Sequence, residues 1–529
     1  MKMDEPRQKP RHELKNVSRR RAAMGNILAN YIMLIIVLIN GVVLVRLYTQ
    51  RIPDKLYGAW LAVGGLLGWL QLVDPGFSKA LQQRVAITFG ELDLERLRRV
   101  IGTGLLIGGG LSLLALGGLP FAKWGVRSLG IVGGDAVELE RSFQIAIVGT
   151  AVALVSYQPL AVVAGLQKSY TMGTLHVASN LVCILVTVLM IVNDYGVQSI
   201  PVGMLCKNVF LLVCSLVVLL VWVWRYLPGR LTVDRSELRA YGGLLSLSFL
   251  ERVGNALIQQ SDTIMVAWLV SPVSAVVYQL TGRAYEMVRI AVGRLAPAIA
   301  PSLSHLAGTK NSERLEEVIH RMSTYVGFLG AVGVASIICM NQAFVTLWVG
   351  PRFYGGMSLT YFLGVMMIVG ILAGQLNEFL YATGGIRDAA LAKFLEGVIR
   401  IPAQWFLAKQ LGLVGIPLGA CLAMIIVGTW MLPLALARRL QKESSYSWKL
   451  TALTYAKPIA ITVFGLLLGL VARQANVASS WSRFVFASLG AGLSLSMLAI
   501  FFYSEIWSEL AAVKQRIVGR TKSSPIARS

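Results

Sequence analysis

Residues 198–224 read QSIPVGMLCKNVFLLVCSLVVLLVWVW, and Lys207 is the only charged residue among them. A helix needs about 20 predominantly apolar residues to cross a hydrocarbon layer roughly 30 Å thick. This stretch meets that condition, so we predict that it is a transmembrane helix. The rest of the chain has the same character: 56% of its 529 residues are hydrophobic and 14% are charged, whereas soluble domains carry about 25% charged residues.

Fourteen stretches of this kind are predicted along the chain. The predicted spans are residues 26–46, 56–73, 100–120, 143–164, 171–192, 198–224, 242–269, 273–294, 324–348, 358–380, 390–408, 412–437, 453–472 and 484–503. The fold class is therefore an all-α polytopic membrane protein with about 14 transmembrane helices. An even number of spans places both termini on the same side of the membrane.

The basic residues indicate the orientation of these spans. The chain holds 49 Lys plus Arg against 26 Asp plus Glu, a net charge of +23. Lys and Arg near span ends are retained on the cytoplasmic side. With cytoplasmic termini, the inner segments hold 32 basic residues and the outer segments hold 9. The excess charge thus fits membrane topology, and we predict no nucleic-acid partner.

An internal repeat divides the chain into two similar halves. Residues 95–101 (ERLRRVI) match 313–319 (ERLEEVI), residues 165–168 (GLQK) match 384–387 (GGIR), and residues 200–203 (IPVG) match 416–419 (IPLG). The offset stays between 216 and 219 residues. Because an even number of spans separates the matches, the halves are predicted to be two parallel six-helix bundles.

The repeat sets the predicted domain boundaries. They are a basic cytoplasmic tail (1–23), an N-terminal six-helix bundle (24–224), a cytoplasmic linker (225–241), a C-terminal six-helix bundle (242–437), two additional helices (438–503) and a second basic cytoplasmic tail (504–529).

Polar side chains line one face of two predicted spans. At about 100° per residue, Ser248, Glu251, Arg252, Asn255, Gln259 and Asp262 fall within one sector of span 242–269. In span 273–294, Gln279, Arg283, Glu286 and Arg294 cluster in the same way, with Arg289 at the edge of the cluster. Charges inside a membrane are costly unless they face protein or water. These two faces are therefore predicted to line a water-filled cavity, although pairing between helices would also account for them.

This cavity holds the candidate site residues. Guanidinium groups bind phosphate oxygens through two parallel hydrogen bonds, so an anionic headgroup suits the cavity better than a cationic drug. The candidate substrate-binding residues are Arg252, Asn255, Gln259, Gln279, Arg283 and Arg289, and the candidate ion-coupling residues are Glu251, Asp262 and Glu286.

Further polar residues lie in two other spans. Span 26–46 carries a weaker line of Asn26, Asn30 and Asn40. In span 390–408, Glu396 and Arg400 have the four-residue spacing of a helical ion pair. Whether that pair is structural or functional stays open from the sequence.

The sequence does not favour an enzyme. It has no phosphate-binding GxxxxGK[ST] loop, no nucleophile elbow, and no outer segment large enough for a catalytic domain. The four histidines have no metal-ligand spacing, and the five cysteines lie in apolar segments without CxxC spacing. We predict no catalytic residues, no metal site and no cofactor.

The chain resembles the polysaccharide-export (Wzx-type) flippases of the multidrug/oligosaccharidyl-lipid/polysaccharide exporter superfamily. The resemblance rests on the plan of twice six helices plus two, on residues 57–60 (YGAW), and on residues 74–77 (DPGF), where the family more often has Asp-Leu-Gly. The turns at 165–168 and 384–387 add to it.

This resemblance implies a transporter of undecaprenyl-diphosphate-linked oligosaccharide in the bacterial inner membrane. The repeat unit of an O-antigen, capsule or exopolysaccharide would cross by alternating access. Cleft arginines that bind the diphosphate carry over to Arg252, Arg283 and Arg289. The implied partners are the lipid-linked glycan, membrane lipids, and a polymerase or glycosyltransferases of the same pathway.

Two other functions remain as alternatives. A cation-coupled multidrug or metabolite exporter of the same superfamily would need an acidic cavity and usually twelve spans. A membrane-embedded glycan polymerase would need a sizeable outer loop with acid or base residues, and the sequence shows none.

Overall fold

The computed structural model describes residues 32, 36, 40–166, 169–227, 229–309, 312–440, 444–472 and 480–503. Every regular element in these residues is a helix, which confirms the all-α fold class. Two compact units divide between Val276 and Val277. We call them the N-terminal unit and the C-terminal unit, and the division lies within one helix, α11 (Pro272–Val292).

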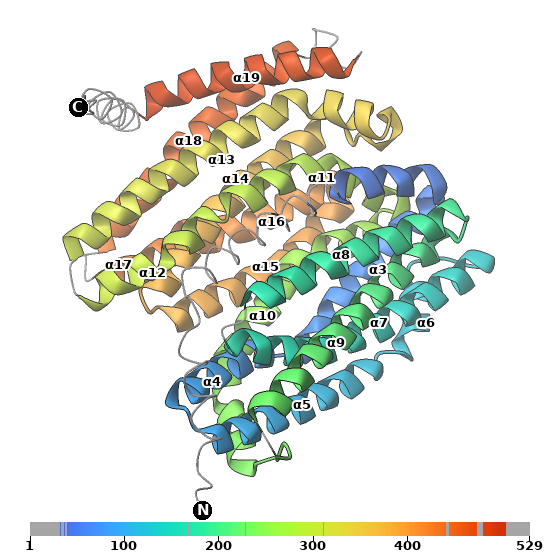
Figure 1. Ribbon diagram of the computed structural model, residues 1–529. Helices are drawn as coiled ribbons and strands as arrows, with labels where there is room; N and C mark the ends of the chain where they lie inside the picture. The colour runs from blue at the N-terminus through green and yellow to red at the C-terminus, as the bar shows by residue number, and fades with distance from the viewer. Residues whose placement is uncertain are drawn as a thin grey trace, which may run out of the picture. The chain divides into compact units, whose positions relative to one another are not determined.

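The N-terminal unit is built around a long central helix, α7. Its helices are α3 (Asp54–Leu70), α4 (Phe77–Glu91), α5 (Leu94–Leu116), α6 (Phe121–Ser128), α7 (Gly134–Gly165), α8 (Ser169–Val192), α9 (Ser199–Tyr226) and α10 (Arg235–Leu269). Helices α5 and α9 lie beside α7 (Figure 1), and α3 and α4 also pack against it. Helix α10 packs against α3.

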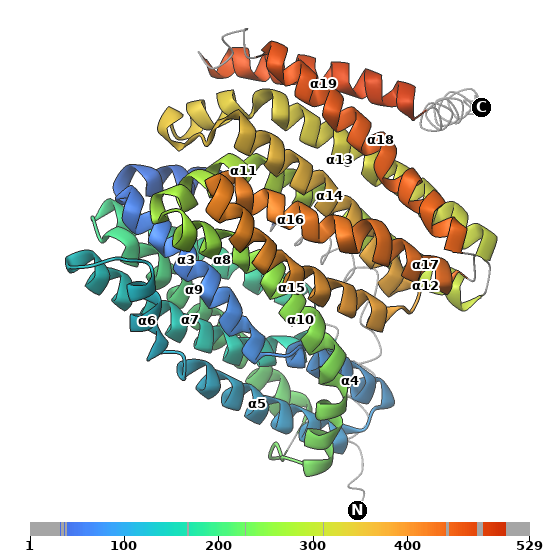
Figure 2. The ribbon, with the colours of Figure 1, turned by 180° about the vertical axis from the view of Figure 1, so that it is seen from behind.

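The C-terminal unit contains the remaining helices. They are the rest of α11, α12 (Leu295–Gly308), α13 (Ser312–Trp348), α14 (Gly356–Ala382), α15 (Ile386–Leu411), α16 (Gly415–Ile426), α17 (Leu432–Arg439), α18 (Ser444–Ala472) and α19 (Trp481–Phe502). A π-helical segment, Val427–Met431, joins α16 to α17. Helices α18 and α19 both pack against α13 (Figure 2).

Ten helical segments of the described chain are long and apolar enough to cross a membrane, so the predicted count of fourteen is not confirmed. The difference has three sources. Span 26–46 lies mostly outside the described residues, and α10 and α11 carry the charges that fill their polar faces. Spans 390–408 and 412–437 form one continuous segment, Ile386–Arg439.

Some predicted features lie outside the described residues. They are the tails 1–23 and 504–529, Asn26 and Asn30 of the first span, and Lys168 of the first repeated turn.

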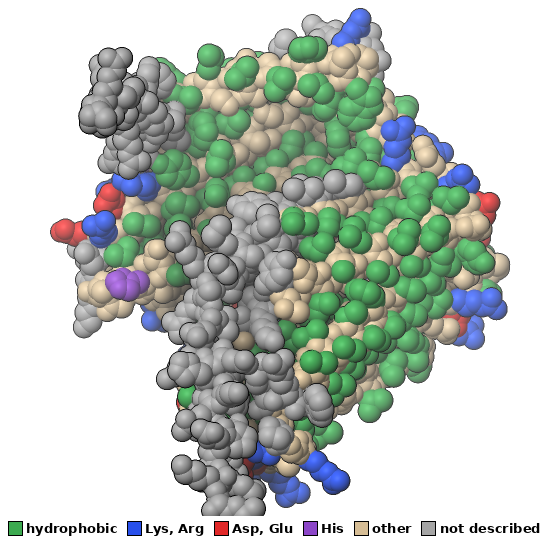
Figure 3. Space-filling view, in the orientation of Figure 1, with side chains coloured by type: hydrophobic (Ala, Val, Ile, Leu, Met, Phe, Trp, Pro, Cys, Tyr) green, Lys and Arg blue, Asp and Glu red, His purple; other side chains and the backbone are tan. Residues whose placement is uncertain are grey.

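Apolar side chains cover the outside of the helices. On α8, Leu181, Leu185 and Leu189 are exposed at four-residue spacing, and α9 exposes Val213 and Val217 in the same way. Figure 3 shows hydrophobic side chains over this face, with Lys and Arg side chains at the helix ends. Apolar surface of this extent is unfavourable in water but not in lipid. The chain is a multi-pass membrane protein.

The third repeated motif has the same local structure in both units. A short 3-10 helix, Gly196–Gln198, precedes α9, and another, Gly412–Val414, precedes α16. A side chain on Gly203 would meet Thr187 Oγ1 at 2.0 Å, and one on Gly419 would meet the Gln404 backbone nitrogen at 2.5 Å. In both motifs the glycine therefore lets the helix contact the preceding one closely.

Candidate functional site

A break between α3 and α4 lies at the sequence Asp-Pro-Gly-Phe-Ser. The Asp74 carboxylate is buried, with 3% of the residue exposed. Its Oδ1 accepts hydrogen bonds from the backbone nitrogens of Gly76 at 2.9 Å and Phe77 at 2.6 Å. Its Oδ2 accepts one from Ser78 Oγ at 2.7 Å. Pro75 has no N–H to donate. The carboxylate therefore caps α4 by binding the backbone nitrogens of the next two residues, Gly76 and Phe77.

Gly76 is required at this turn by its backbone geometry. Its φ is +105°, a left-handed conformation that residues with a Cβ atom rarely adopt. The Pro-Gly pair, which departs from the usual family motif, thus produces a tight turn that exposes the Asp74 carbonyl to α10.

Arg252 of α10 binds that carbonyl. Its Nη1 donates a hydrogen bond of 2.7 Å to the Asp74 backbone oxygen. The side chain is half-buried, and within the described part of the chain it forms no ion pair. The guanidinium is therefore fixed in position by a neutral acceptor, and its charge is not neutralised by a carboxylate.

Helix α7 contributes a tyrosine that the sequence did not predict as a site residue. Tyr157 lies in α7 and is 37% exposed. The next residue, Gln158, holds α7 against the turn, since its Nε2 donates to Ser78 Oγ at 3.4 Å. The polar pair Tyr-Gln followed by Pro159 within apolar span 143–164 was the available signal.

The other predicted residues of α10 lie on the same side as Arg252. Helix α10 turns its Gln260 and Ile264 toward α3, where Gly65 and Gly68 allow close contact. At about 100° per residue, Asn255, Gln259 and Asp262 lie on the side of α10 that is turned away from α3. Gln259 is exposed, and Glu251, Asn255 and Asp262 are half-buried.

In the C-terminal unit, two predicted residues of α11 bind each other. Arg289 Nε donates to Glu286 Oε2 at 2.6 Å, and Arg289 Nη2 donates to Glu286 Oε1. A candidate substrate-binding cation and a candidate ion-coupling carboxylate thus form a two-bond pair. Arg283 differs, because its buried Nε has no hydrogen-bond partner among the described residues. Gln279, also on α11, is half-buried.

The pair predicted in span 390–408 is present on α15. Arg400 Nη1 lies 3.8 Å from Glu396 Oε1, and both side chains are largely buried. Arg400 Nη2 also contacts Met366 Sδ of α14 at 3.9 Å. These contacts are those of a buried ion pair.

A second ionic cluster holds the start of α10 against α4 and α5. Glu237 binds Arg84 of α4, and Arg96 Nε of α5 lies 3.4 Å from Glu237 Oε1. The Asp234 carboxylate caps α10, and the hydrogen bonds it accepts from Ser236 lower its pKa. Glu237 itself is buried.

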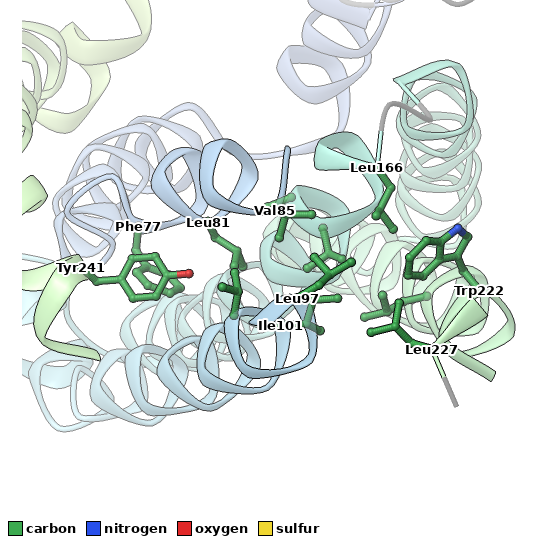
Figure 4. Close-up of a cluster of buried hydrophobic side chains, with 13 residues drawn as sticks. Phe77, Leu81, Val85, Leu97, Ile101, Leu166, Trp222, Leu227 and Tyr241 are labelled. Atoms are coloured by element: carbon green, nitrogen blue, oxygen red, sulfur yellow. The ribbon is translucent and has the colours of Figure 1, made fainter. Parts of the chain in front are cut away.

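Apolar packing adjoins this cluster. The rings of Phe77 and Tyr241 meet edge to face at 4.7 Å, and Arg84 stacks 4.9 Å from the Tyr241 ring. Figure 4 shows Tyr241 and Phe77 at one end of a buried group that extends to Trp222 and Leu227. The connection between α9 and α10 is therefore anchored on the N-terminal unit.

No group of three or more potential metal ligands lies together in the described residues. All five cysteines are free thiols.

The comparisons with known proteins agree with this membrane architecture. A family described as "Polysaccharide biosynthesis protein" matches residues 137–355, less than half of the chain. A Yersinia pseudotuberculosis protein whose name assigns it to O-antigen export is 21% identical over 187 residues. That match covers 35% of this chain and 43% of the relative.

The solved structures extend the similarity along the chain. The lipid II flippase MurJ is 14% identical with a TM-score of 0.61, covering 91% of this chain and 99% of MurJ. An inward-facing multidrug resistance MATE transporter is 13% identical with a TM-score of 0.62, covering 77% and 95%. The Vibrio cholerae MATE transporter VcmN is 16% identical with a TM-score of 0.57, covering 81% and 99%.

The resemblance to the polysaccharide-export family is confirmed. The chain has the fold of the MurJ and MATE transporters. These relatives are transporters and an export protein, not catalytic enzymes, as the sequence predicts.

Proposed function

We propose that this protein is a flippase that moves an undecaprenyl-diphosphate-linked oligosaccharide from the inner to the outer leaflet of a bacterial cytoplasmic membrane. The family match at residues 137–355 and the O-antigen export relative support a glycan cargo. The fold likeness to MurJ, named as a flippase of lipid II, supports a lipid-linked form of that cargo.

The observation that carries the proposal is the state of Arg252. Its guanidinium is half-buried, fixed by the Asp74 carbonyl and unpaired with any described carboxylate. An uncompensated cation within a membrane protein is costly unless an anion or water meets it. The diphosphate of a lipid-linked glycan would supply such an anion.

The remaining site residues are assigned on the same reasoning. Substrate would contact Arg252, Asn255 and Gln259 of α10 and Gln279, Arg283 and Arg289 of α11. Coupling to an ion gradient would use Glu251, Asp262 or Glu286. Both termini would be cytoplasmic, and the two six-helix bundles would keep the boundaries predicted from the repeat.

A cation-coupled multidrug exporter is the second candidate. It is favoured by the MATE transporters, whose TM-scores lie in the same range as that of MurJ. In such an exporter the carboxylates Glu251 and Asp262 would meet a cationic drug.

Leaflet exchange in proteoliposomes separates these two functions. The full-length protein is reconstituted with undecaprenyl diphosphate that carries a fluorescent oligosaccharide, and dithionite added outside bleaches the label it reaches. Flipping exposes the label of both leaflets, whereas liposomes without protein keep the inner label protected. Protected label together with ethidium uptake driven by a proton gradient would instead identify a drug exporter.

A further inference from the structure

We infer that Lys207 of α9 is a proton-binding site in the membrane interior of the N-terminal unit, and that the proton it exchanges is coupled to transport. The inference rests on the proposed function and names its coupling ion. The carboxylates predicted to couple an ion all lie on α10 and α11, whereas this site lies between α8 and α9.

Lys207 contacts a neutral amide of the neighbouring helix. Its Nζ donates a hydrogen bond of 3.1 Å to Asn180 Oδ1 of α8. The amide is held in this orientation, because Asn180 Nδ2 donates to the His176 carbonyl at 2.8 Å. Gly203, one turn before Lys207, brings α9 close to Thr187 of α8. The lysine side chain therefore spans the gap between two closely packed helices.

This contact lies deep in the membrane. Helix α8 comprises residues 169–192, so Asn180 is about 17 Å from either end. Half the thickness of the hydrocarbon layer is about 15 Å. The exposed Val209 lies about 200° around α9 from Lys207, so the amine is turned away from lipid. A charged amine at this depth is costly unless an anion or water compensates it.

No carboxylate is placed to compensate this amine. The six predicted spans of the N-terminal bundle contain no Asp or Glu, and Lys207 is the only Lys or Arg inside them apart from Arg46 at the end of the first. Within the described part of the chain Lys207 forms no ion pair. The carboxylates of α10 are on a helix that packs against α3, α4 and α5, not on the partners of α9.

The other titratable groups around the amine supply no negative charge either. Helix α9 packs against α7, α8 and the short helix Gly196–Gln198. Between Arg141 and Tyr157, α7 has no titratable residue, and the short helix has none. On α8, His176 lies one turn from Asn180 on the same face, and Cys183 lies three residues away on the other side. An imidazole and a thiol are both neutral in their ordinary uncharged forms.

These surroundings favour exchange of a proton over binding of an anion. A lysine amine can release its proton, whereas a guanidinium cannot. The Asn180 oxygen accepts a hydrogen bond from the neutral and from the charged amine alike. An anion would need further donors, but the Asn180 Nδ2 is already bound to the His176 carbonyl. Uptake of a proton by the Nζ lone pair adds one positive charge to the membrane interior, and the His176 imidazole is placed to pass that proton toward the nearer end of α8.

Leaflet exchange under a pH gradient tests the coupling. Full-length protein is reconstituted with the fluorescent undecaprenyl diphosphate oligosaccharide, and exchange is measured with and without an imposed pH difference. We expect the gradient to accelerate exchange by the wild type. Lys207→Arg keeps the charge but cannot release the proton, and Asn180→Asp places a carboxylate that retains it. Both variants should exchange at the same rate with and without the gradient.

The matched control is a second lysine inside a predicted span. Lys457 of α18 lies 5.1 Å from the Tyr503 ring, so Lys457→Arg keeps a cation beside an aromatic face. This variant should respond to the gradient as the wild type does.

Proton uptake by the purified protein requires no cargo. Between about pH 9 and pH 6, where ordinary lysines keep their proton, the wild type should take up about one proton per chain more than Lys207→Arg. Lys207→Met, which is similar in length and uncharged, should show the same deficit and covers the case in which arginine does not fit. Lys457→Arg should match the wild type.

The outcomes separate this inference from the proposed function. Equal proton uptake by the wild type, Lys207→Arg and Lys207→Met would overturn the inference and leave the flippase proposal standing. A gradient response that survives in Lys207→Arg and is lost in Lys207→Met would show that a fixed charge suffices, which also overturns it. Extra proton uptake by a wild type that does not exchange the lipid would support the proton site and contradict the proposed cargo.

Discussion

Glu237 at the start of α10 binds Arg84 of α4, and only 7% of the Glu237 side chain and 16% of the Arg84 side chain are exposed. Arg96 of α5 approaches the other carboxylate oxygen. One buried carboxylate thus joins three helices of the N-terminal unit, at the point where the chain leaves α9 for α10.

Removing this carboxylate should destabilise the protein. Glu237→Ala leaves the largely buried Arg84 without its anion, and loss of one partner of such a pair costs roughly 3 kcal/mol. The melting temperature of the detergent-solubilised protein should fall clearly. Glu95→Ala is the control, because Glu95 is 79% exposed and lies 3.9 Å from Arg99. Equal melting temperatures for both variants would show that the Glu237 cluster adds no stability.

The Asp74 cap should matter for both stability and binding. Asp74→Ala removes the acceptor of three hydrogen bonds and alters the turn that presents its carbonyl to Arg252. Loss of a helix cap costs about 1 kcal/mol. Asp93 caps α5 through the Arg96 backbone nitrogen at 2.9 Å and is exposed. Asp93→Ala should therefore lower the melting temperature and leave undecaprenyl diphosphate binding intact, whereas Asp74→Ala should reduce both.

The polar faces could be predicted from the sequence because they follow helical periodicity along one element. The predicted span began at residue 242, but α10 begins at Arg235. The sequence does contain a signal for that earlier start, since Asp234 and Glu237 have the spacing of a capping box. The contact of α7 with the Asp74 turn could not be predicted, because the hydrogen bond from Gln158 to Ser78 depends on how the two helices pack. The pairing of Glu286 with Arg289 depends on side-chain rotamers that periodicity leaves open.

Close contact between α3 and the start of α11 depends on Gly58. A Cβ there would lie 1.8 Å from the Pro272 carbonyl oxygen, a backbone atom that must shift. Gly58→Ala should therefore lower the melting temperature, as expected for overpacking by about 1–3 kcal/mol. Gly64→Ala on the same helix meets no atom within 4 Å and should be neutral or stabilising by up to about 1 kcal/mol. The reverse order of stabilities would contradict this packing.

Arg283 and Arg400 provide a final contrast, between an arginine proposed to bind substrate and an arginine in a buried ion pair. Arg400 is buried 3.8 Å from Glu396, so Arg400→Ala removes a buried cation from beside this carboxylate and should lower stability by roughly 3 kcal/mol. The buried Nε of Arg283 has no hydrogen-bond partner in the described residues. Arg283→Ala therefore breaks no hydrogen bond of this atom within the described part of the chain. We expect Arg283→Ala to melt like the wild type and to lose leaflet exchange. The melting temperature and the leaflet exchange are measured for each variant. An Arg400→Ala protein that is stable but lacks exchange would assign α15 to transport. Normal exchange by Arg283→Ala would show that this residue does not belong to the substrate site.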